Sequence, residues 1–213
     1  MKIGRGGGSD VIKLSVLISG LLPLLGMVAA AVINQLGPDP AKALVEASGL
    51  WAFRLLLLCL AMTPLRILTG MSVWLSYRRM LGLLAMFYGT LHLLAYGILL
   101  LGGDFAMLSR ELAKRPYIIV GFSAWLLMLP LAMTSTRQWQ KRLGKQWLLL
   151  HKLVYGIALL GMVHFIWLKK IGIWAVWPYA VILTILLLLR VPGIRRFIIQ
   201  IRSKMQARKM SSD

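Results

Sequence analysis

The sequence predicts an all-α integral membrane protein: a six-transmembrane-helix bundle with both termini cytoplasmic and short interfacial helices. Residues of the types AVILMFWYC make up 59% of the 213 positions, whereas soluble domains average roughly 45–50%. The mean hydropathy is +0.78, and six apolar stretches are each long enough to cross a bilayer core of about 30 Å as a helix. Together with the single cysteine, Cys59, these features exclude a disordered chain, a disulfide-rich scaffold and a conventional soluble enzyme.

The six predicted spans lie at residues 14–33, 49–68, 81–101, 117–133, 147–168 and 173–190. Basic residues precede the first span, as in a signal peptide, but its apolar run from Leu14 to Ile33 exceeds the roughly 7–15 residues of a signal-peptide core. We therefore expect a retained helix. The chain then divides into a basic cytoplasmic N-terminus at 1–13, a six-helix transmembrane domain at 14–190 and a basic amphipathic cytoplasmic tail at 191–213.

Lysine and arginine gather on one side of the predicted membrane. That side holds both termini, the loop with Arg66, Arg78 and Arg79, and the loop at 134–146, with 17 basic residues against six on the other side. Cytoplasmic loops collect Lys and Arg, so both termini are predicted to face the cytoplasm. In so apolar a chain, the formal charge of +19 indicates contact with anionic membrane lipid and no nucleic-acid partner.

Two segments outside the spans are predicted to lie on the membrane surface. Residues 135–146 place Trp139 among basic residues in a short helix. Residues 194–208 form a helical pattern with basic residues on one side and an apolar stripe on the other, made of Ile194, Phe197, Ile198, Ile201 and Met205. Such a helix suits an anionic leaflet, and docking to a partner protein is the alternative.

All three histidines fall within predicted spans: His92 on the third, His151 and His164 on the fifth. An ionisable group at membrane depth is costly and marks a functional site, although a histidine can also serve only as an interhelical hydrogen bond. A proton relay is disfavoured because no span carries an acid near its middle. His151 and His164 lie about 20 Å apart along a helix, too far to share one zinc ion. Haem fits better, since its iron takes axial imidazoles and its macrocycle can lie between helices.

Depth in the membrane selects the pair. His92 and His164 differ in depth by about 7 Å, whereas His92 and His151 differ by about 12 Å. Gly89 and Gly161 each stand three residues before one histidine of the first pair, where a glycine lets a flat porphyrin approach the backbone. Ordinary small-residue helix packing explains these glycines equally well. His92 with His164 is the preferred haem pair.

His151 has no evident partner in the sequence, so its role stays open. It ligates a second haem, or it contacts a propionate, a flavin or a quinone head group. Arg78 and Arg79 are expected at similar depth, where they could pair with propionates or phosphate. Positive-inside anchoring is the alternative for both arginines. One haem b is expected, and two if His151 finds a second ligand.

Several short strings in this order resemble one family. They are Thr63-Pro64-Leu65-Arg66, Arg78-Arg79-Met80-Leu81-Gly82-Leu83, Thr90-Leu91-His92-Leu93, Arg115-Pro116-Tyr117, Thr134-Ser135-Thr136 and Leu143-Gly144-Lys145-Gln146-Trp147 leading to His151. Six spans with histidines confined to the third and fifth, and an H-x₁₂-H spacing on the fifth, resemble the ferric reductase and NADPH oxidase transmembrane domain. Within that superfamily, the strings look like the MsrQ (YedZ) family of haem-binding membrane subunits.

The resemblance implies an electron carrier in the bacterial inner membrane. In that family, electrons from the quinol pool or a cytosolic flavin reductase pass outward to MsrP, a periplasmic molybdopterin enzyme that reduces methionine sulfoxide in oxidised periplasmic proteins. The family is associated with haem b and FMN. Its haem histidines correspond here to His92, His151 and His164.

The chain is expected to be an electron-transfer subunit with no substrate-reducing site of its own. The predicted outward loops at 34–48, 102–116 and 169–172 are too small for substrate chemistry, so a partner protein must complete the reaction. One alternative is a stand-alone cytochrome b that exchanges electrons with quinone or metal ions. Another is a transporter or structural membrane protein whose histidines only form hydrogen bonds.

Overall fold

A computed structural model describes residues 7–168 and 173–210, and its regular structure there is entirely helical. The elements are α1 (Gly7–Val32), α2 (Pro40–Thr69), α3 (Val73–Ala95), the π-helical η1 (Tyr96–Leu100), α4 (Phe105–Lys114), α5 (Pro116–Met133), α6 (Arg137–Leu143), α7 (Lys145–Leu150), α8 (Leu153–Leu168), α9 (Ile173–Leu188) and α10 (Pro192–Met210). Within the described residues, five helical segments are long and apolar enough to cross a membrane, and a sixth span results if the bent pair α9–α10 counts as one. The prediction of an all-helical membrane protein is confirmed.

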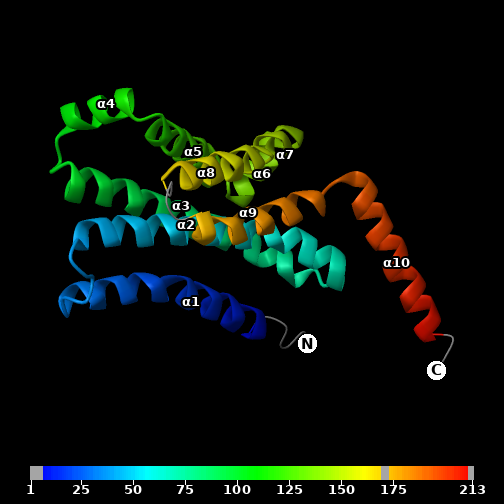
Figure 1. Ribbon diagram of the computed structural model, residues 1–213. Helices are drawn as coiled ribbons and strands as arrows, with labels where there is room; N and C mark the ends of the chain where they lie inside the picture. The colour runs from blue at the N-terminus through cyan, green and yellow to red at the C-terminus, as the bar shows by residue number, and fades with distance from the viewer. Residues whose placement is uncertain (1–6, 169–172, 211–213) are drawn as a thin grey trace.

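The long helices run side by side, with their connections gathered at two ends (Figure 1). One end, here called the tail end, carries the α2–α3 turn, α6, α7 and the start of α10. The opposite end, here called the α4 end, carries α4 and the connection between α1 and α2. The segments predicted to be cytoplasmic therefore lie at the tail end, as far as they belong to the described residues. The predicted 169–172 loop and the outermost residues of both termini lie outside the described residues.

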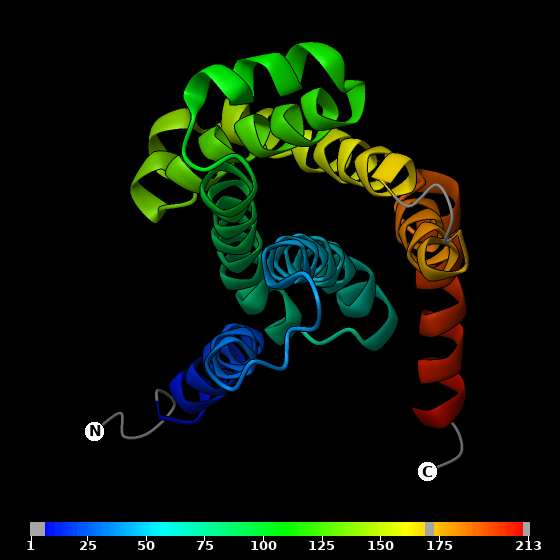
Figure 2. The ribbon, with the colours of Figure 1, turned by 60° about the vertical axis from the view of Figure 1, so that its left-hand side comes forward.

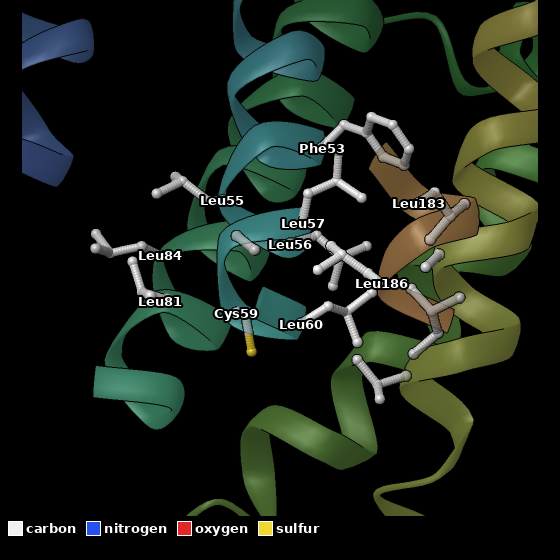
Figure 3. Packing of buried hydrophobic residues seen from close by; sticks show 14 of the residues in the cluster. Phe53, Leu55, Leu56, Leu57, Cys59, Leu60, Leu81, Leu84, Leu183 and Leu186 are labelled. Carbon is white, nitrogen blue, oxygen red and sulfur yellow. The ribbon is translucent and has the colours of Figure 1, made fainter. Parts of the chain in front are cut away.

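Helix α2 occupies the centre of the bundle, with the other spans around it (Figure 2). It is apolar on every side rather than along one stripe, which is the pattern of a helix enclosed by others. Leu55, Leu56 and Leu57 are consecutive and all buried. As Figure 3 shows, Leu55 lies on the side of Leu84, whereas Leu57 and Leu56 lie on the side of Leu186 from α9. The outer helices expose large apolar side chains, as contact with lipid requires.

Several helices begin earlier than hydropathy predicts. Helix α2 begins at Pro40 rather than at 49, because the Asp39 side chain accepts a hydrogen bond from the Lys42 backbone at 3.0 Å and proline suits the first helical position. Helix α3 begins at Val73 rather than at 81, so Arg78 and Arg79 stand on a helix and not in a loop. Charged residues lower the local hydropathy of both helix starts without preventing helix formation.

The predicted loop at 102–116 contains a helix, α4, that the sequence analysis missed. The Asp104 carboxylate accepts hydrogen bonds from the backbones of Ala106 and Met107, at 2.7 and 3.2 Å. These bonds satisfy two of the free N–H groups at the helix start. This segment is therefore a structured connection at the α4 end of the bundle.

The fifth predicted span is interrupted, and the sixth ends at Leu188 rather than at 190. The fifth consists of α7 and α8, and His151 lies at the break between them. In the sixth, α9 ends at Leu188 and the chain turns by 76° into α10. The surface helices predicted at 135–146 and 194–208 correspond to α6 and α10, although the side chain of Met205 lies outside the described residues.

Prolines leave backbone carbonyls without their usual partners, and arginine uses one of them. Pro64 has no N–H to donate to the carbonyl of Leu60, four residues earlier. The Arg190 guanidinium, at the end of the last span, donates to that carbonyl and to the Tyr155 hydroxyl. Arg190 thereby links α2, α8 and the end of α9.

Helix α1 lies at the edge of the bundle and is held by a tyrosine from α3. Tyr88 is fully buried, and its hydroxyl donates to the Gly20 carbonyl at 2.9 Å while accepting from the Leu24 backbone at 3.0 Å. Gly20 also packs closely on Leu84, because a Cβ at Gly20 would lie 2.6 Å from a Leu84 methyl group. Pro23 lies between these contacts, at a position where α1 already lacks one backbone donor.

We predict that Tyr88→Phe weakens the attachment of α1. The substitution removes both hydrogen bonds and should lower the free energy of unfolding by about 1 kcal/mol. Thermal unfolding in detergent, together with amide hydrogen exchange, measures the effect, and exchange should rise selectively in α1. Tyr77→Phe in the same helix is the matched control, and unchanged exchange of α1 in Tyr88→Phe would contradict the prediction.

Candidate functional site

A cavity of about 790 Å³ lies between the central and outer helices, within the size range of cofactor and ligand pockets. Its lining comes from α2, α3, η1, α4, α5, α8 and α9. The walls are mainly apolar and include Phe53, Trp125, Met128, Ile157 and Phe165. A large flat apolar group with polar substituents at its edge fits such a lining.

His92 and His164 meet in this cavity. His92 comes from α3 and His164 from α8. Their ring centroids are 6.2 Å apart and their ring planes lie at 79°. The two helices therefore bring together, at one depth, the two histidines that the sequence places at comparable depth.

Each ring is fixed by a hydrogen bond to a backbone carbonyl of a neighbouring helix. His92 Nδ1 lies 2.8 Å from the Val45 carbonyl on α2, and His164 Nδ1 lies 2.6 Å from the Tyr117 carbonyl on α5. In both cases the carbonyl belongs to the residue 47 positions earlier. A carbonyl oxygen only accepts, so Nδ1 must carry the proton and Nε2 keeps its lone pair. This is how metal-binding histidines are commonly oriented.

Two glycines let the rings approach these carbonyls. A Cβ at Gly49 would lie 2.8 Å from His92 Nδ1, and a Cβ at Gly121 would lie 2.6 Å from His164 Nδ1. Each glycine stands four residues after the carbonyl that holds the ring, one helical turn further along. Any larger residue at either position would displace the imidazole.

Gly49 and Gly121 were not predicted from the sequence, from which Gly89 and Gly161 were expected to approach the porphyrin. The latter two also line the cavity, but their nearest neighbours are Trp125 and Phe53. The signal available in the sequence was the equal spacing from glycine to histidine in the two halves of the chain. This spacing can be interpreted only once α2 is known to pack on α3 and α5 on α8.

The separation of the two rings suits a metal between them. An imidazole nitrogen binds such a metal at about 2.0–2.1 Å and lies about 1.2 Å from its ring centre, so two imidazoles that bound one iron from opposite sides would have ring centres about 6.4–6.6 Å apart. The observed 6.2 Å is close to this range. The described residues contain no group of three or more His, Cys, Asp or Glu that could hold a metal by itself. Haem, whose porphyrin supplies the other ligands, therefore fits these residues.

An intramembrane arginine also lines the cavity. Arg54 Nε donates to the Tyr179 hydroxyl at 2.9 Å, and the guanidinium lies over the Trp51 ring, 4.9 Å from its centroid. Among the described residues Arg54 forms no ion pair with a carboxylate. A cation held at membrane depth by aromatic groups alone is available for an anionic substituent of a ligand.

Charged residues line the cavity at the α4 end. Asp39, Lys42, Glu46 and Arg115 all belong to its lining. The hydrogen bond to the Tyr117 hydroxyl and the nearby Glu111 carboxylate raise the pKa of Arg115 above its ordinary value. Arg115 therefore stays positively charged at any physiological pH.

The remaining predicted site residues lie elsewhere. His151 is not part of the cavity lining; its ring stacks on Trp147 with centroids 4.0 Å apart, and its Nδ1 lies 3.1 Å from the Trp147 carbonyl. Arg78 is close enough to His151 for their charges to interact, whereas Arg79 is exposed. Neither arginine lines the cavity.

Known proteins are similar in sequence to this chain over the part that contains the cavity. The family described as ferric reductase like transmembrane component matches residues 48–162, a stretch that includes His92 and His151 and ends just before His164. The chain is 53% identical over 154 residues to the protein-methionine-sulfoxide reductase heme-binding subunit MsrQ of Xanthomonas axonopodis pv. citri (strain 306), covering 72% of this chain and 71% of that protein. It is 49% identical over 170 residues to the subunit of the same name from Polaromonas naphthalenivorans (strain CJ2), covering 78% of each chain.

We predict that Gly49→Ala and Gly121→Ala each displace a histidine ring. Overpacking a close contact costs about 1–3 kcal/mol, so haem retained per purified chain should fall roughly tenfold. Optical quantification of haem against protein measures the loss. Gly156→Ala is the matched control, since Gly156 lies on the His164 helix and a Cβ there meets nothing within 4 Å. Full haem content in both cavity variants would refute this role for the glycines.

Proposed function

The chain belongs to the MsrQ family of ferric reductase-like transmembrane components, and on that premise we propose that it is a haem b subunit of a methionine sulfoxide reductase system. It carries electrons across the bacterial inner membrane to a periplasmic reductase of the MsrP type, which repairs oxidised periplasmic proteins. The observation that carries the proposal is the His92–His164 pair, with its ring centroids 6.2 Å apart in an apolar cavity.

His92 and His164 would hold the haem iron through Nε2. Their Nδ1–H groups donate to the Val45 and Tyr117 carbonyls, which fixes the ring orientation and increases the basicity of Nε2. When bound, haem supplies one-electron chemistry, because its iron alternates between ferric and ferrous states. The apolar walls keep water from the site and so influence the reduction potential.

Arg54 is the best-placed partner for a haem propionate. It lines the cavity, whereas Arg78 and Arg79 do not. Lys42 lines the same cavity at the α4 end and could pair with a second propionate. Charge-assisted hydrogen bonds of this kind would anchor the polar edge of the macrocycle. For Arg78 and Arg79, positive-inside anchoring at the tail end is then the preferred role.

The direction of electron flow follows from the orientation of the bundle. We place the tail end in the cytoplasm, because the basic segments of the chain gather there. Electrons would enter from quinol or from a cytosolic flavin reductase and leave at the α4 end. Reduction of one sulfoxide to a thioether consumes two electrons and two protons and releases water, so the periplasmic partner must collect two successive transfers.

His151 is the candidate for a second cofactor contact. It lies nearer the tail end, with Trp147 stacked on its ring and Arg78 nearby. A second haem, a quinone head group or FMN would each find an imidazole and a cation there. Flavin fluorescence and haem content, measured on the same purified sample, separate these three occupants.

The histidine variants test the haem pair directly. His92→Ala and His164→Ala should each abolish the low-spin b-type bands in the reduced-minus-oxidised spectrum, whereas His151→Ala should spare part of them. Haem quantified per chain accompanies each spectrum. Equal loss in all three variants would reject the pairing, and a wild-type protein without haem, from cells supplied with it, would reject the proposed function.

Removing the Arg54 charge should lower the midpoint potential of the haem. A nearby cation favours the ferrous state, since that state carries one positive charge fewer. We expect Arg54→Gln to lower the potential by on the order of 50 mV, as measured by optical redox titration. Arg66→Gln, at an exposed position of the same helix, should leave the potential unchanged. The same potential in Arg54→Gln and the wild type would exclude Arg54 as a propionate partner.

A further inference from the structure

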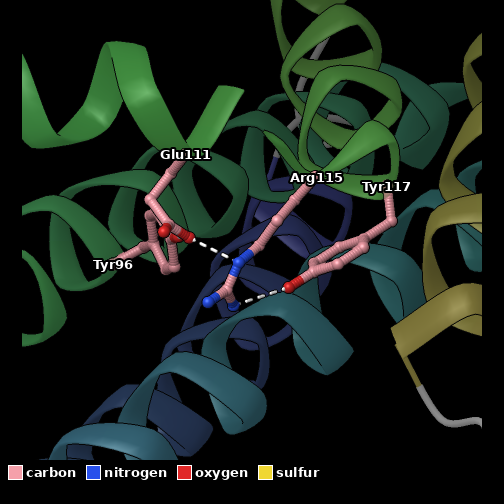
Figure 4. A network of polar contacts seen from close by, with 4 residues as sticks. All are labelled: Tyr96, Glu111, Arg115 and Tyr117. Atoms are coloured by element: carbon pink, nitrogen blue, oxygen red, sulfur yellow. Dashed lines mark hydrogen bonds and ion pairs between the residues drawn. The ribbon is translucent and has the colours of Figure 1, made fainter. Parts of the chain in front are cut away.

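A chain of polar contacts crosses the α4 end of the bundle (Figure 4). The Arg115 guanidinium pairs with the Glu111 carboxylate at 2.7 Å and donates to the Tyr117 hydroxyl at 3.0 Å. The same Glu111 oxygen accepts from the Tyr96 hydroxyl at 3.2 Å. We call these four residues, Tyr96, Glu111, Arg115 and Tyr117, the polar clamp.

Both ends of the polar clamp connect directly to a histidine of the cavity. Tyr96 follows the helix of His92, and its backbone N–H donates to the His92 carbonyl. The carbonyl of Tyr117 is the one that holds His164 Nδ1, at 2.6 Å. The side-chain contacts of Glu111 and Arg115 thus join the backbone after one histidine to the carbonyl that fixes the other.

The two histidines belong to two separate helix pairs. His92 on α3 is seated against α2, and α2 packs mainly on α3. His164 on α8 is seated against α5, and α5 packs mainly on α8. The two pairs contact each other less extensively than the helices within each pair. The distance between the histidines therefore depends on how the pairs are held together.

We infer that the polar clamp fixes the position of the α2–α3 pair relative to the α5–α8 pair, and so sets the mutual orientation of His92 and His164. This inference rests on the proposed haem function. Glu111, Arg115 and the two tyrosines are positioning residues in this scheme, since they act through the two helix pairs. Helix α4 carries Glu111 and adds Leu108 and Leu112 to the cavity lining at this end.

The partial burial of Glu111 distinguishes its ion pair from an ordinary surface pair. The Glu111 side chain is only 15% exposed, while that of Arg115 is 52% exposed. A carboxylate that is largely removed from water needs hydrogen-bond partners. Here one Glu111 oxygen accepts from both the Arg115 guanidinium and the Tyr96 hydroxyl. The exposed arginine remains open to screening by salt.

Electron paramagnetic resonance of the ferric protein tests the inference, because the low-spin signal depends on the angle between the two imidazole planes. Ring planes at 79° should produce a larger maximum g value than parallel planes produce. Glu111→Gln and Tyr117→Phe should lower or broaden that signal, and haem should transfer to an apomyoglobin acceptor about threefold faster. Arg115→Lys should restore part of the wild-type behaviour that Arg115→Gln loses.

Arg110→Gln is the matched control, since Arg110 is an exposed arginine of the same helix outside the clamp, and it should leave both readouts unchanged. High salt applied to the unmodified protein should shift the signal in the same direction as the variants, without any risk of misfolding. An unchanged g value and transfer rate in the clamp variants and in salt would overturn the inference alone. A wild-type protein without low-spin haem would instead overturn the proposed function beneath it.

Discussion

Two hydrogen bonds, from His92 to the Val45 carbonyl and from His164 to the Tyr117 carbonyl, fix the two rings of the cavity on which the rest of the structure depends. Each bond requires a ring to lie flush against a neighbouring backbone, and each neighbouring helix supplies a glycine at that point. The protonated Nδ1 leaves Nε2 as the only free nitrogen of each ring. Because the carbonyls belong to rigid helices, ring orientation is set by the packing of the helices.

The bundle is therefore best understood as two helix pairs around one cavity. Helix α2 serves both purposes, since it seats His92 and also forms the apolar centre against which α9 and α1 pack. Polar side chains secure the outer elements: Tyr88 holds α1, and Arg190 binds a carbonyl that Pro64 leaves free. Within the membrane no water is available to pair with these polar groups, so leaving them unpaired would be costly. Each of these contacts avoids that cost and also connects two helices.

Hydropathy predicted the helical fold, because helices that contact lipid require long apolar segments, which are easily recognised in the sequence. It misplaced the starts of α2 and α3, since Asp39 caps a helix and Arg78 continues one despite their charge. The constant rise of a helix sufficed to favour His92 with His164 over His92 with His151. Gly49 and Gly121 escaped notice because their role arises only when helices distant in the chain come into contact.

The length of α2 has a consequence for access to the cavity. Its 30 residues extend about 45 Å, well beyond a hydrocarbon core of about 30 Å, and its first turns, which carry charged side chains, are suited to the head-group layer. Lys42 and Glu46 stand on those turns and line the cavity. The excess length of α2 therefore places this rim of the mainly apolar cavity at the level of the lipid head groups. A water-soluble protein can approach that rim without displacing a single acyl chain.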